Sequence, residues 1–450
     1  MTEEAPSDEP ARQPASENPW YVLMTVAGPQ DGETIDWDRH LQNQRYFNGW
    51  MAQALTEDDK QRLINQGCAT AEDLAPLTDA EKREIARQLG TRCPEAARPD
   101  PSKSLVDLAS CAFAAQLVCS GFIFPGGASF RYARFKGDAN FEHATFLRDT
   151  DFDDTDFLRG TNFQAAKFEE GAYFRRAEFS RDALFQQAIF QEATRFLFAE
   201  LKQDAHFQQA AFQAIADFEG ATFTGHAFFN HATFSRASVF RNAKFKSPTK
   251  FENVTFDREH ASPPQFSGAT LHEETRWDGI KTWPLPGSGH NPADFILAYE
   301  KLKHLMDDQK KLDSEHMFHK LELQSKAIAE TGTLASFASW LYRILSDYGW
   351  SIQRPAIGLG IVFALGWILI YADQISEQRF GDGEFLGGWT YGAVSLSNVF
   401  GFLGLGGTFL ADDLKTLTGF SQVVSGLQTF FSLILIFLLG LALRNRFRIK

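Results

Sequence analysis

The chain has 450 residues, a formal net charge of −13 at pH 7 and 44 phenylalanines. This length allows two or three domains, and the negative charge excludes a generally basic nucleic-acid binder. The four cysteines, at positions 68, 93, 111 and 119, lack metal-ligand or redox spacing, so we expect reduced thiols in a cytosolic setting.

Residues 1–18 are acidic and proline-rich and contain no apolar core of a signal peptide, so we predict a disordered tail. Residues 19–103 are predicted to form a small mixed α/β domain. It would begin with a strand at 19–28. The residues that follow have apolar side chains at helical spacing, and Thr56 is the expected N-cap of a new helix. We can attach no chemistry to this domain.

From Phe130 to Phe256 a phenylalanine recurs at alternating gaps of five and six residues, with Leu201 as the exception. The residue two positions earlier is almost always small. A helix, with 3.6 residues per turn, would spread these positions around its whole surface. A strand places residues i−2 and i on one face, so each unit points one small and one large side chain inward before the chain turns.

The period of eleven residues predicts a solenoid, in which each coil buries its inner face against the next. The phenylalanines of successive coils stack on each other only if each coil contains an even number of units, which excludes three sides. Two sides would be too flat to enclose the rings. The remaining possibility is a coil of four sides and about 22 residues. Phe130, Phe152 and Phe174 would then begin one ladder, and Phe135, Phe157 and Phe179 the next.

The stretch GAYFRRAEFSRDALFQQAIF (171–190) resembles the Phe-rich form of the pentapeptide-repeat family, and the likeness extends over roughly 120 to 280. It implies a right-handed quadrilateral β-helix but little about function, because one fold hosts many activities. We predict this all-β solenoid, with its caps, at 104–283. Residues 104–118 either continue the coils or form a capping helix, and a proline-containing loop at 257–265 interrupts them. Flanking segments should cover the open sheet edges.

Residues 291–350 are predicted to form a helical connector. Asn291 is the expected N-cap and Pro292 the first helical residue, while Phe295, Tyr299, Leu302 and Met306 would share one face. His316 and His319 lack a third ligand, so we expect a solvated face rather than a metal site. We expect no cofactor and no metal.

Residues 351–450 are predicted to form an α-helical transmembrane segment with two spans, at about 355–372 and 423–443. The basic tail at 444–450 should stay in the cytoplasm, and acidic residues crowd the segment between the spans. The expected location is therefore the inner (cytoplasmic) membrane of a bacterium, with both termini cytoplasmic.

The stretch at 385–411 is uncharged and glycine-rich, and we expect a re-entrant or interfacial loop there. The membrane segment weakly resembles a two-span ion-channel pore module. This resemblance implies possible pore-lining residues, which are Ser395, Ser397, Asn398, Gly401 and Gln428. Phe402 stands where a potassium filter has its second glycine, which argues against potassium selectivity.

No phosphate loop, nucleophile elbow or HExxH motif is present, so we do not expect an enzyme. From Ala128 to Arg258 there are 18 acidic and 17 basic residues, a balance that argues against a DNA-mimicking rod. Two hypotheses remain. The chain is a membrane-anchored scaffold or sensor that binds an unidentified protein partner, or it is an oligomeric ion channel with cytoplasmic β-helix domains. The expected partners are the lipid bilayer, a protein and further copies of the chain, but not nucleic acid.

Overall fold

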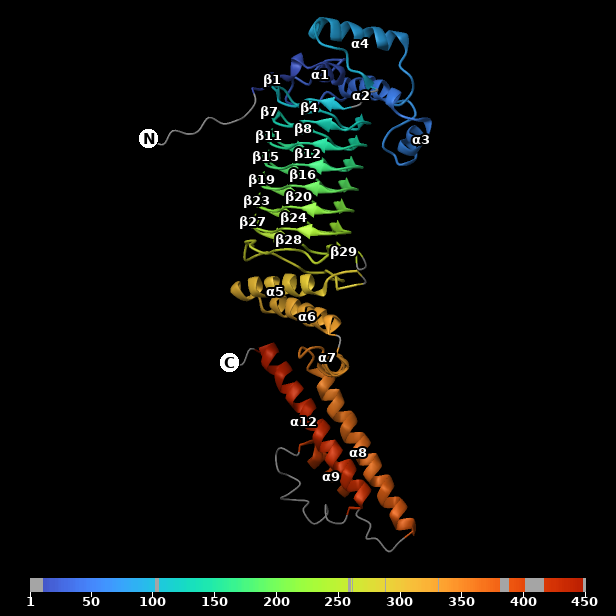
Figure 1. The fold of residues 1–450 in the computed structure, drawn as a ribbon, viewed down its shortest axis with the longest axis vertical. Coiled ribbons are helices and arrows are strands. Elements are labelled where there is room, and N and C mark those ends of the chain that lie inside the picture. Colours follow the sequence, from blue (N-terminus) through green and yellow to red (C-terminus); the bar gives the residue numbers. More distant parts are fainter. Residues whose placement is uncertain are drawn as a thin grey trace, which may run out of the picture. The chain divides into compact units, whose positions relative to one another are not determined.

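The computed structural model describes residues 11–101, 105–257, 260, 262–287, 289–330, 332–380, 388–400 and 417–447. The chain divides into two compact units, Met1–Ser325 and Lys326–Lys450. The first unit holds a β-solenoid with helices at both ends, and the second holds four helices among its described residues (Figure 1).

Four parallel sheets form the sides of the solenoid, and consecutive strands of the chain belong to different sheets. One sheet contains β1 (Gln13–Pro14), β3 (Cys111–Phe113), β7 (Arg134–Phe135), β11 (Asp156–Phe157), β15 (Glu178–Phe179), β19 (Glu200–Leu201), β23 (Thr222–Phe223) and β27 (Lys244–Phe245). The next contains β2 (Val106–Asp107), β6 (Ala128–Ser129), β10 (Thr150–Asp151), β14 (Ala172–Tyr173), β18 (Thr194–Arg195), β22 (Ala216–Asp217) and β26 (Ser238–Val239).

The third sheet contains β4 (Leu117–Val118), β8 (Ala139–Asn140), β12 (Thr161–Asn162), β16 (Ala183–Leu184), β20 (Ala205–His206), β24 (Ala227–Phe228) and β28 (Thr249–Lys250). The fourth contains β5 (Ile123–Phe124), β9 (Thr145–Phe146), β13 (Lys167–Phe168), β17 (Ile189–Phe190), β21 (Ala211–Phe212), β25 (Thr233–Phe234) and β29 (Thr255–Phe256).

The register confirms the four-sided coil. Phe157 is paired with Phe135 on one side and with Phe179 on the other, so neighbouring strands are 22 residues apart. The rings of these pairs are parallel, with centroids 4.9 Å apart. The inward phenylalanines are almost completely buried, and small residues such as Ala183 fill the space between the ladders. Burial of these rings contributes about 1.5–3 kcal/mol for each side chain.

The alternation of five and six residues comes from two kinds of corner. In the five-residue corners, residues with positive φ recur every eleven positions, for example Tyr132, His143 and Asp154 at 60°, 56° and 56°. Ala133 N donates to Phe130 O at 2.9 Å across one such corner, as expected for a β-turn that needs positive φ at its third residue. Most of these residues are not glycine, so the corners store strain that the coil-to-coil hydrogen bonds offset.

This geometry predicts opposite effects for two adjacent alanines. Ala165 has a φ of 54°, whereas Ala166 is not among the positive-φ residues and is fully buried. Ala165→Gly should raise the free energy of unfolding by up to about 1 kcal/mol, because relief of about 1–2 kcal/mol of left-handed strain exceeds the entropic cost of glycine. Ala166→Gly should lower it by about 1 kcal/mol. Thermal denaturation of the purified full-length protein checks both, and equal shifts of the same sign would contradict this account.

Helices at the N-terminal side cover the first coil. They are η1 (Ala15–Glu17), α1 (Pro19–Met24), α2 (Trp37–Met51), η2 (Ala52–Ala54), α3 (Glu57–Asn65) and α4 (Asp79–Arg92). Phe47 of α2 stacks on Phe122 with a centroid distance of 4.7 Å, and Tyr21 of α1 contacts the edge of Phe113. The expectation that flanking segments cap the solenoid is confirmed at this end.

Two predictions at this end are wrong. Residues 19–28 do not form a strand, because Asn18 accepts a hydrogen bond from Trp20 N and Pro19 starts α1. The disordered tail predicted for 1–18 does not include β1, whose residues pair with Cys111 and Ala112 of β3. Arg12 also donates to Tyr132 O at 2.8 Å and to Asp156 Oδ2 at 2.9 Å. Residues 104–118 continue the coils through β2, β3 and β4, where the structure describes them.

The other end of the solenoid is covered by α5 (Pro292–Asp308) and α6 (Leu312–Ala329) (Figure 1). One coil is longer than the others, since Phe240 stacks on Phe266 at 4.8 Å and Phe251 stacks on Trp277. Within the predicted loop at 257–265, residues 258, 259 and 261 lie outside the described residues. Asn291 caps α5 as predicted, and its four predicted apolar residues are buried. Phe318 of α6 packs edge-on against Trp277 at 5.7 Å. The predicted connector therefore contributes part of the C-terminal cap.

The second unit contains α7 (Thr333–Ser346), α8 (Gln353–Phe380), α9 (Gly388–Val399) and α12 (Gly419–Phe447). Two segments, Gln353–Ser376 and Gly419–Asn445, are long and apolar enough to cross a membrane. Helices α8, α9 and α12 pack against one another.

Candidate functional site

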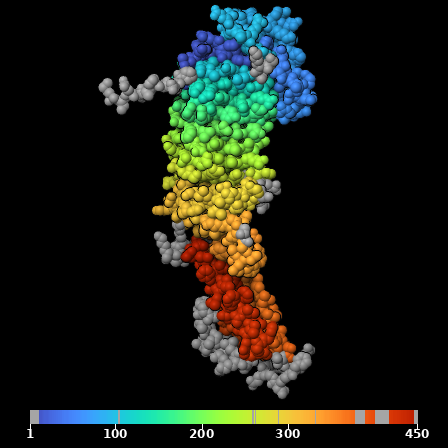
Figure 2. Space-filling model, in the orientation of Figure 1, coloured from blue at the N-terminus to red at the C-terminus, as the bar shows by residue number. Residues whose placement is uncertain are grey.

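The N-terminal helices also extend along one side of the solenoid. Leu63 of α3 and Leu74 pack with Ile123 and Leu147, which belong to the first coils. In the space-filling view the blue N-terminal residues pass from the end of the solenoid onto its side (Figure 2). Thr56 and Asp59 fix the start of α3 by a reciprocal capping box, as the sequence predicts. Hydrogen bonds from Thr56 are the main reason why the pKa of Asp59 is lowered.

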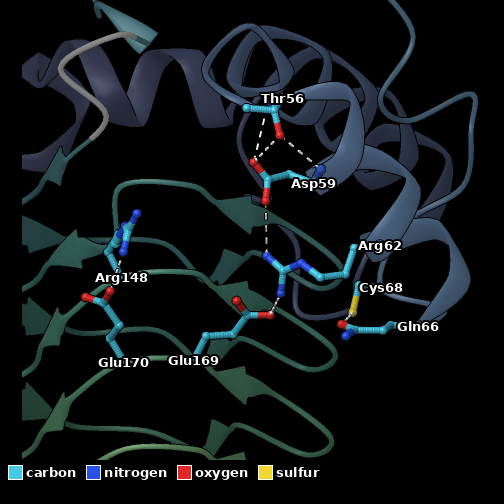
Figure 3. Close-up of polar contacts among 8 residues, drawn as sticks. All are labelled: Thr56, Asp59, Arg62, Gln66, Cys68, Arg148, Glu169 and Glu170. Atoms are coloured by element: carbon cyan, nitrogen blue, oxygen red, sulfur yellow. Dashed lines mark hydrogen bonds and ion pairs between the residues drawn. The ribbon is translucent and has the colours of Figure 1, made fainter.

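One ion pair joins α3 to the solenoid, and two others lie beside it, one within α3 and one within the solenoid (Figure 3). Arg62 contacts Glu169 Oε1 at 2.6 Å and Asp59 Oδ1 at 3.4 Å. Arg148 pairs with Glu170 of the next coil. These side chains line a hollow of about 230 Å³ together with Leu55. Cations and carboxylates therefore alternate around this hollow.

Buried His40 on α2 makes the N-terminal cap sensitive to pH. Its Nε2 lies 3.0 Å from Ser120 O, and burial lowers the pKa of the imidazole. The unfolded chain therefore binds a proton at higher pH than the folded chain, and stability falls as the pH drops from about 6.5 towards the folded pKa. We expect the melting temperature of the full-length protein to decrease between pH 7 and pH 5, and His40→Gln to reduce that decrease. The same decrease in the variant would exclude His40 as its source.

The four cysteines of the chain are free thiols and are buried. Burial raises the pKa of Cys111 to about 11 and that of Cys119 well above the ordinary value. Cys68 lies close to Gln66 beside the hollow (Figure 3), and Lys167 Nζ lies 3.0 Å from its sulfur. Among the described residues no group of three or more His, Cys, Asp or Glu could hold a metal ion.

Most of the predicted pore-lining residues are buried in the second unit, and two of them are in contact. Ser395, Ser397, Asn398 and Gln428 are all buried between its helices. Asn398 Nδ2 donates to Gln428 Oε1 at 3.2 Å, and Gln428 Nε2 donates to Val362 O of α8 at 3.2 Å. The remaining predicted residue, Gly401, lies outside the described residues.

Helix α9 ends at the middle of the two long helices. Near its start, Tyr391 packs with Ile370 of α8, with Leu417 just before α12 and with Val424. Its later residue Asn398 reaches Gln428, which bonds with Val362. The helix therefore starts beside Ile370 of α8 and the first turns of α12, and it ends beside Val362 of α8 and Gln428 of α12.

Several polar residues of this unit were not predicted. Asp373 Oδ2 accepts hydrogen bonds from Thr418 and, at 2.5 Å, from Ser421 Oγ at the start of α12. Buried Ser421, Gln428 and Ser432 follow one stripe of α12. Gly366 of α8 faces the Gln428 carboxamide, which would collide with any Cβ at that position. Serine or glutamine at spacings of four and seven within an apolar helix is the signal that indicates such a stripe.

Large apolar side chains cover the outside of the same helices. Ile361 and Leu365 of α8 are 53% and 55% exposed, and Phe437 of α12 is 70% exposed. A helix pair in water buries such residues and exposes its serines and glutamines. This unit has the opposite arrangement.

Comparison with known families identifies the solenoid. Residues 120–166, 141–189 and 185–233 match the family model described as pentapeptide repeats (9 copies). Together with the four-sided coil, this match shows that the chain carries a pentapeptide-repeat β-helix. Searches of curated proteins and of solved structures return no match.

Proposed function

We propose that this protein is a membrane-anchored pentapeptide-repeat scaffold in a bacterial inner membrane, with both termini in the cytoplasm. The observation that carries the anchoring is the arrangement of side chains in the second unit, where Phe437 is 70% exposed and Gln428 is 4% exposed. Helices in lipid pack through small and polar residues and present apolar residues to the acyl chains. The two long helices have the length that a bilayer requires.

The β-helix supports the scaffold role because its interior is filled and both ends are covered by helices. The binding surface is then the polar exterior, including the hollow beside α3 where Arg62 and Arg148 face Glu169 and Glu170 (Figure 3). Helix α3 and the strands hold these side chains in place, which lowers the entropic cost of binding a folded protein partner. The proposed partner is a protein with charges of both signs on its surface.

The anchoring is tested by alkaline extraction of membranes from cells that express the full-length chain. Wild-type protein should stay in the pellet. A variant with Ile361→Lys, Leu365→Lys and Ile368→Lys, all on the exposed surface of α8, should be extracted into the supernatant. The matched control, Ile361→Leu, Leu365→Ile and Ile368→Leu, should behave like the wild type. Release of the wild type by the alkaline wash would contradict the anchoring.

An ion pore is the second candidate, and the course of α9 favours it. A short helix that enters between two long ones and ends at a buried Asn398–Gln428 pair is the arrangement that a re-entrant pore loop requires. Such a pore needs several copies of the chain around an axis. Ion flux into liposomes that contain the full-length protein tests this candidate. Asn398→Leu with Gln428→Leu should abolish a flux that the exposed substitution Leu427→Ile leaves intact, and inserted protein without flux would rule the pore out.

A further inference from the structure

Helix α7 carries an unpartnered apolar stripe on its surface. Leu334, Phe337, Trp340 and Ile344 are spaced at three or four residues and are 81%, 56%, 48% and 45% exposed. Phe337 and Trp340 stack on each other with a centroid distance of 5.8 Å. These residues recur on one side of the helix, so the stripe is continuous over its whole length. Contiguous exposed apolar surface marks contact with a membrane or a protein.

A rigid elbow joins α7 to α8. Asp347, Tyr348 and Gly349 have consecutive positive φ values of 51°, 60° and 79°, although two of them are not glycine. Such strain persists only where the surrounding structure imposes it. Gly349 N donates to Ser346 Oγ at 3.0 Å and closes the elbow.

The elbow also fixes α7 to the ends of both long helices. Asn445 Nδ2 of α12 donates to Gly349 O at 3.1 Å, and Arg354 of α8 donates to Arg343 O of α7 at 2.8 Å. At its Ile344 end the stripe therefore adjoins the apolar outer surfaces of α8 and α12. Exposed arginines at 343, 354 and 444 lie at the same level.

We propose that α7 is an in-plane membrane helix, whose stripe from Leu334 to Ile344 lies in the boundary between lipid headgroups and acyl chains at the cytoplasmic surface. This inference rests on the proposed anchoring. The occupant is lipid because the stripe continues the surface proposed to face the bilayer, and because aromatic residues and arginines are the residues that favour this boundary. The arginines add attraction to anionic headgroups. The chain thus enters the membrane through a helix that lies along its surface, and the elbow sets that direction.

Nitroxide labels on the full-length protein in anionic vesicles test the proposal. The four native cysteines are buried, so single engineered cysteines dominate the labelling. Phe337→Cys and Ile344→Cys place labels on the stripe, and Ala335→Cys places one on the opposite side of α7. Phe437→Cys on α12 reports insertion itself. The stripe labels should relax strongly with oxygen and weakly with a water-soluble nickel chelate, whereas the label at 335 should show the reverse.

The possible failures are distinguishable. If the labels at 337 and 344 are as accessible to nickel as the label at 335 while the label at 437 is in lipid, the inference on α7 is wrong and the anchoring stands. Shielding of the stripe labels from both oxygen and nickel would mean that protein covers the stripe, which also overturns the inference. A label at 437 that nickel reaches would overturn the proposed anchoring.

Discussion

Phe196→Ala is expected to lower the free energy of unfolding by about 3–5 kcal/mol. Phe196 is fully buried and stacks between Phe174 and Phe218, with centroid distances of 4.6 and 5.0 Å. It also meets the edges of Phe185 and Phe207 at 5.4 and 5.6 Å. Truncation leaves a cavity between two coils that the stacked backbone cannot close. Thermal denaturation of the full-length protein, followed by circular dichroism, measures the loss.

Phe198 is the matched control because it has the same chemistry two residues later. It is 56% exposed at a corner with positive φ and lies over Gly220. Phe198→Ala removes little buried area, so we expect a change within about 0.5 kcal/mol. Similar losses in the free energy of unfolding for both variants would contradict this account, because the effect would then not depend on burial inside the coils.

Lys303→Met is expected to destabilise the C-terminal cap by about 3 kcal/mol. Lys303 Nζ lies 2.7 Å from Glu322 Oε2, and the Glu322 side chain is only 4% exposed. Removal of the lysine takes a cation away from a buried carboxylate, and this loss costs more than the net contribution of the pair. The His319 ring lies 3.4 Å from the same oxygen and compensates in part. A decrease in the melting temperature of the full-length protein is the expected readout.

Two further variants separate charge burial from lost packing. Lys301→Met changes an exposed lysine of the same helix and should have little effect. Adding Glu322→Gln to Lys303→Met removes the buried negative charge and should restore part of the stability. Failure of this rescue would show that the lysine acts through its aliphatic packing rather than through its charge.

The solenoid was predictable from sequence because its constraints are local and repeated. Each corner follows a phenylalanine. The alternation of five-residue and six-residue gaps therefore requires an even number of sides in each coil. The helix at 19–24 was not predictable in the same way, because Tyr21, Val22, Leu23 and Met24 are all buried. A short apolar run without periodicity fits a strand or a helix, and only Asn18 and Pro19 indicate which.

The candidate membrane site was predictable only in part. The buried Asn398 and Gln428 stand out as polar residues in apolar sequence, but their mutual hydrogen bond depends on how α9 packs between α8 and α12. The roles of Gly366 and Asp373 depend on the same packing, since each meets a residue of or beside α12. Contacts between segments so distant in sequence leave no periodic signal in either one. The pairing of β1 with β3 was missed for the same reason.

Modification by a membrane-impermeant maleimide tests most directly whether the chain crosses a membrane twice with its β-helix in the cytoplasm. Trp389→Cys, 90% exposed at the start of α9, and Arg236→Cys, exposed on the solenoid, serve as the two sites, and the native thiols are buried. The cysteine at 389 should react in intact cells, and the cysteine at 236 should react only after lysis. Equal reaction of both sites in intact cells, or of both only after lysis, would contradict the proposed topology.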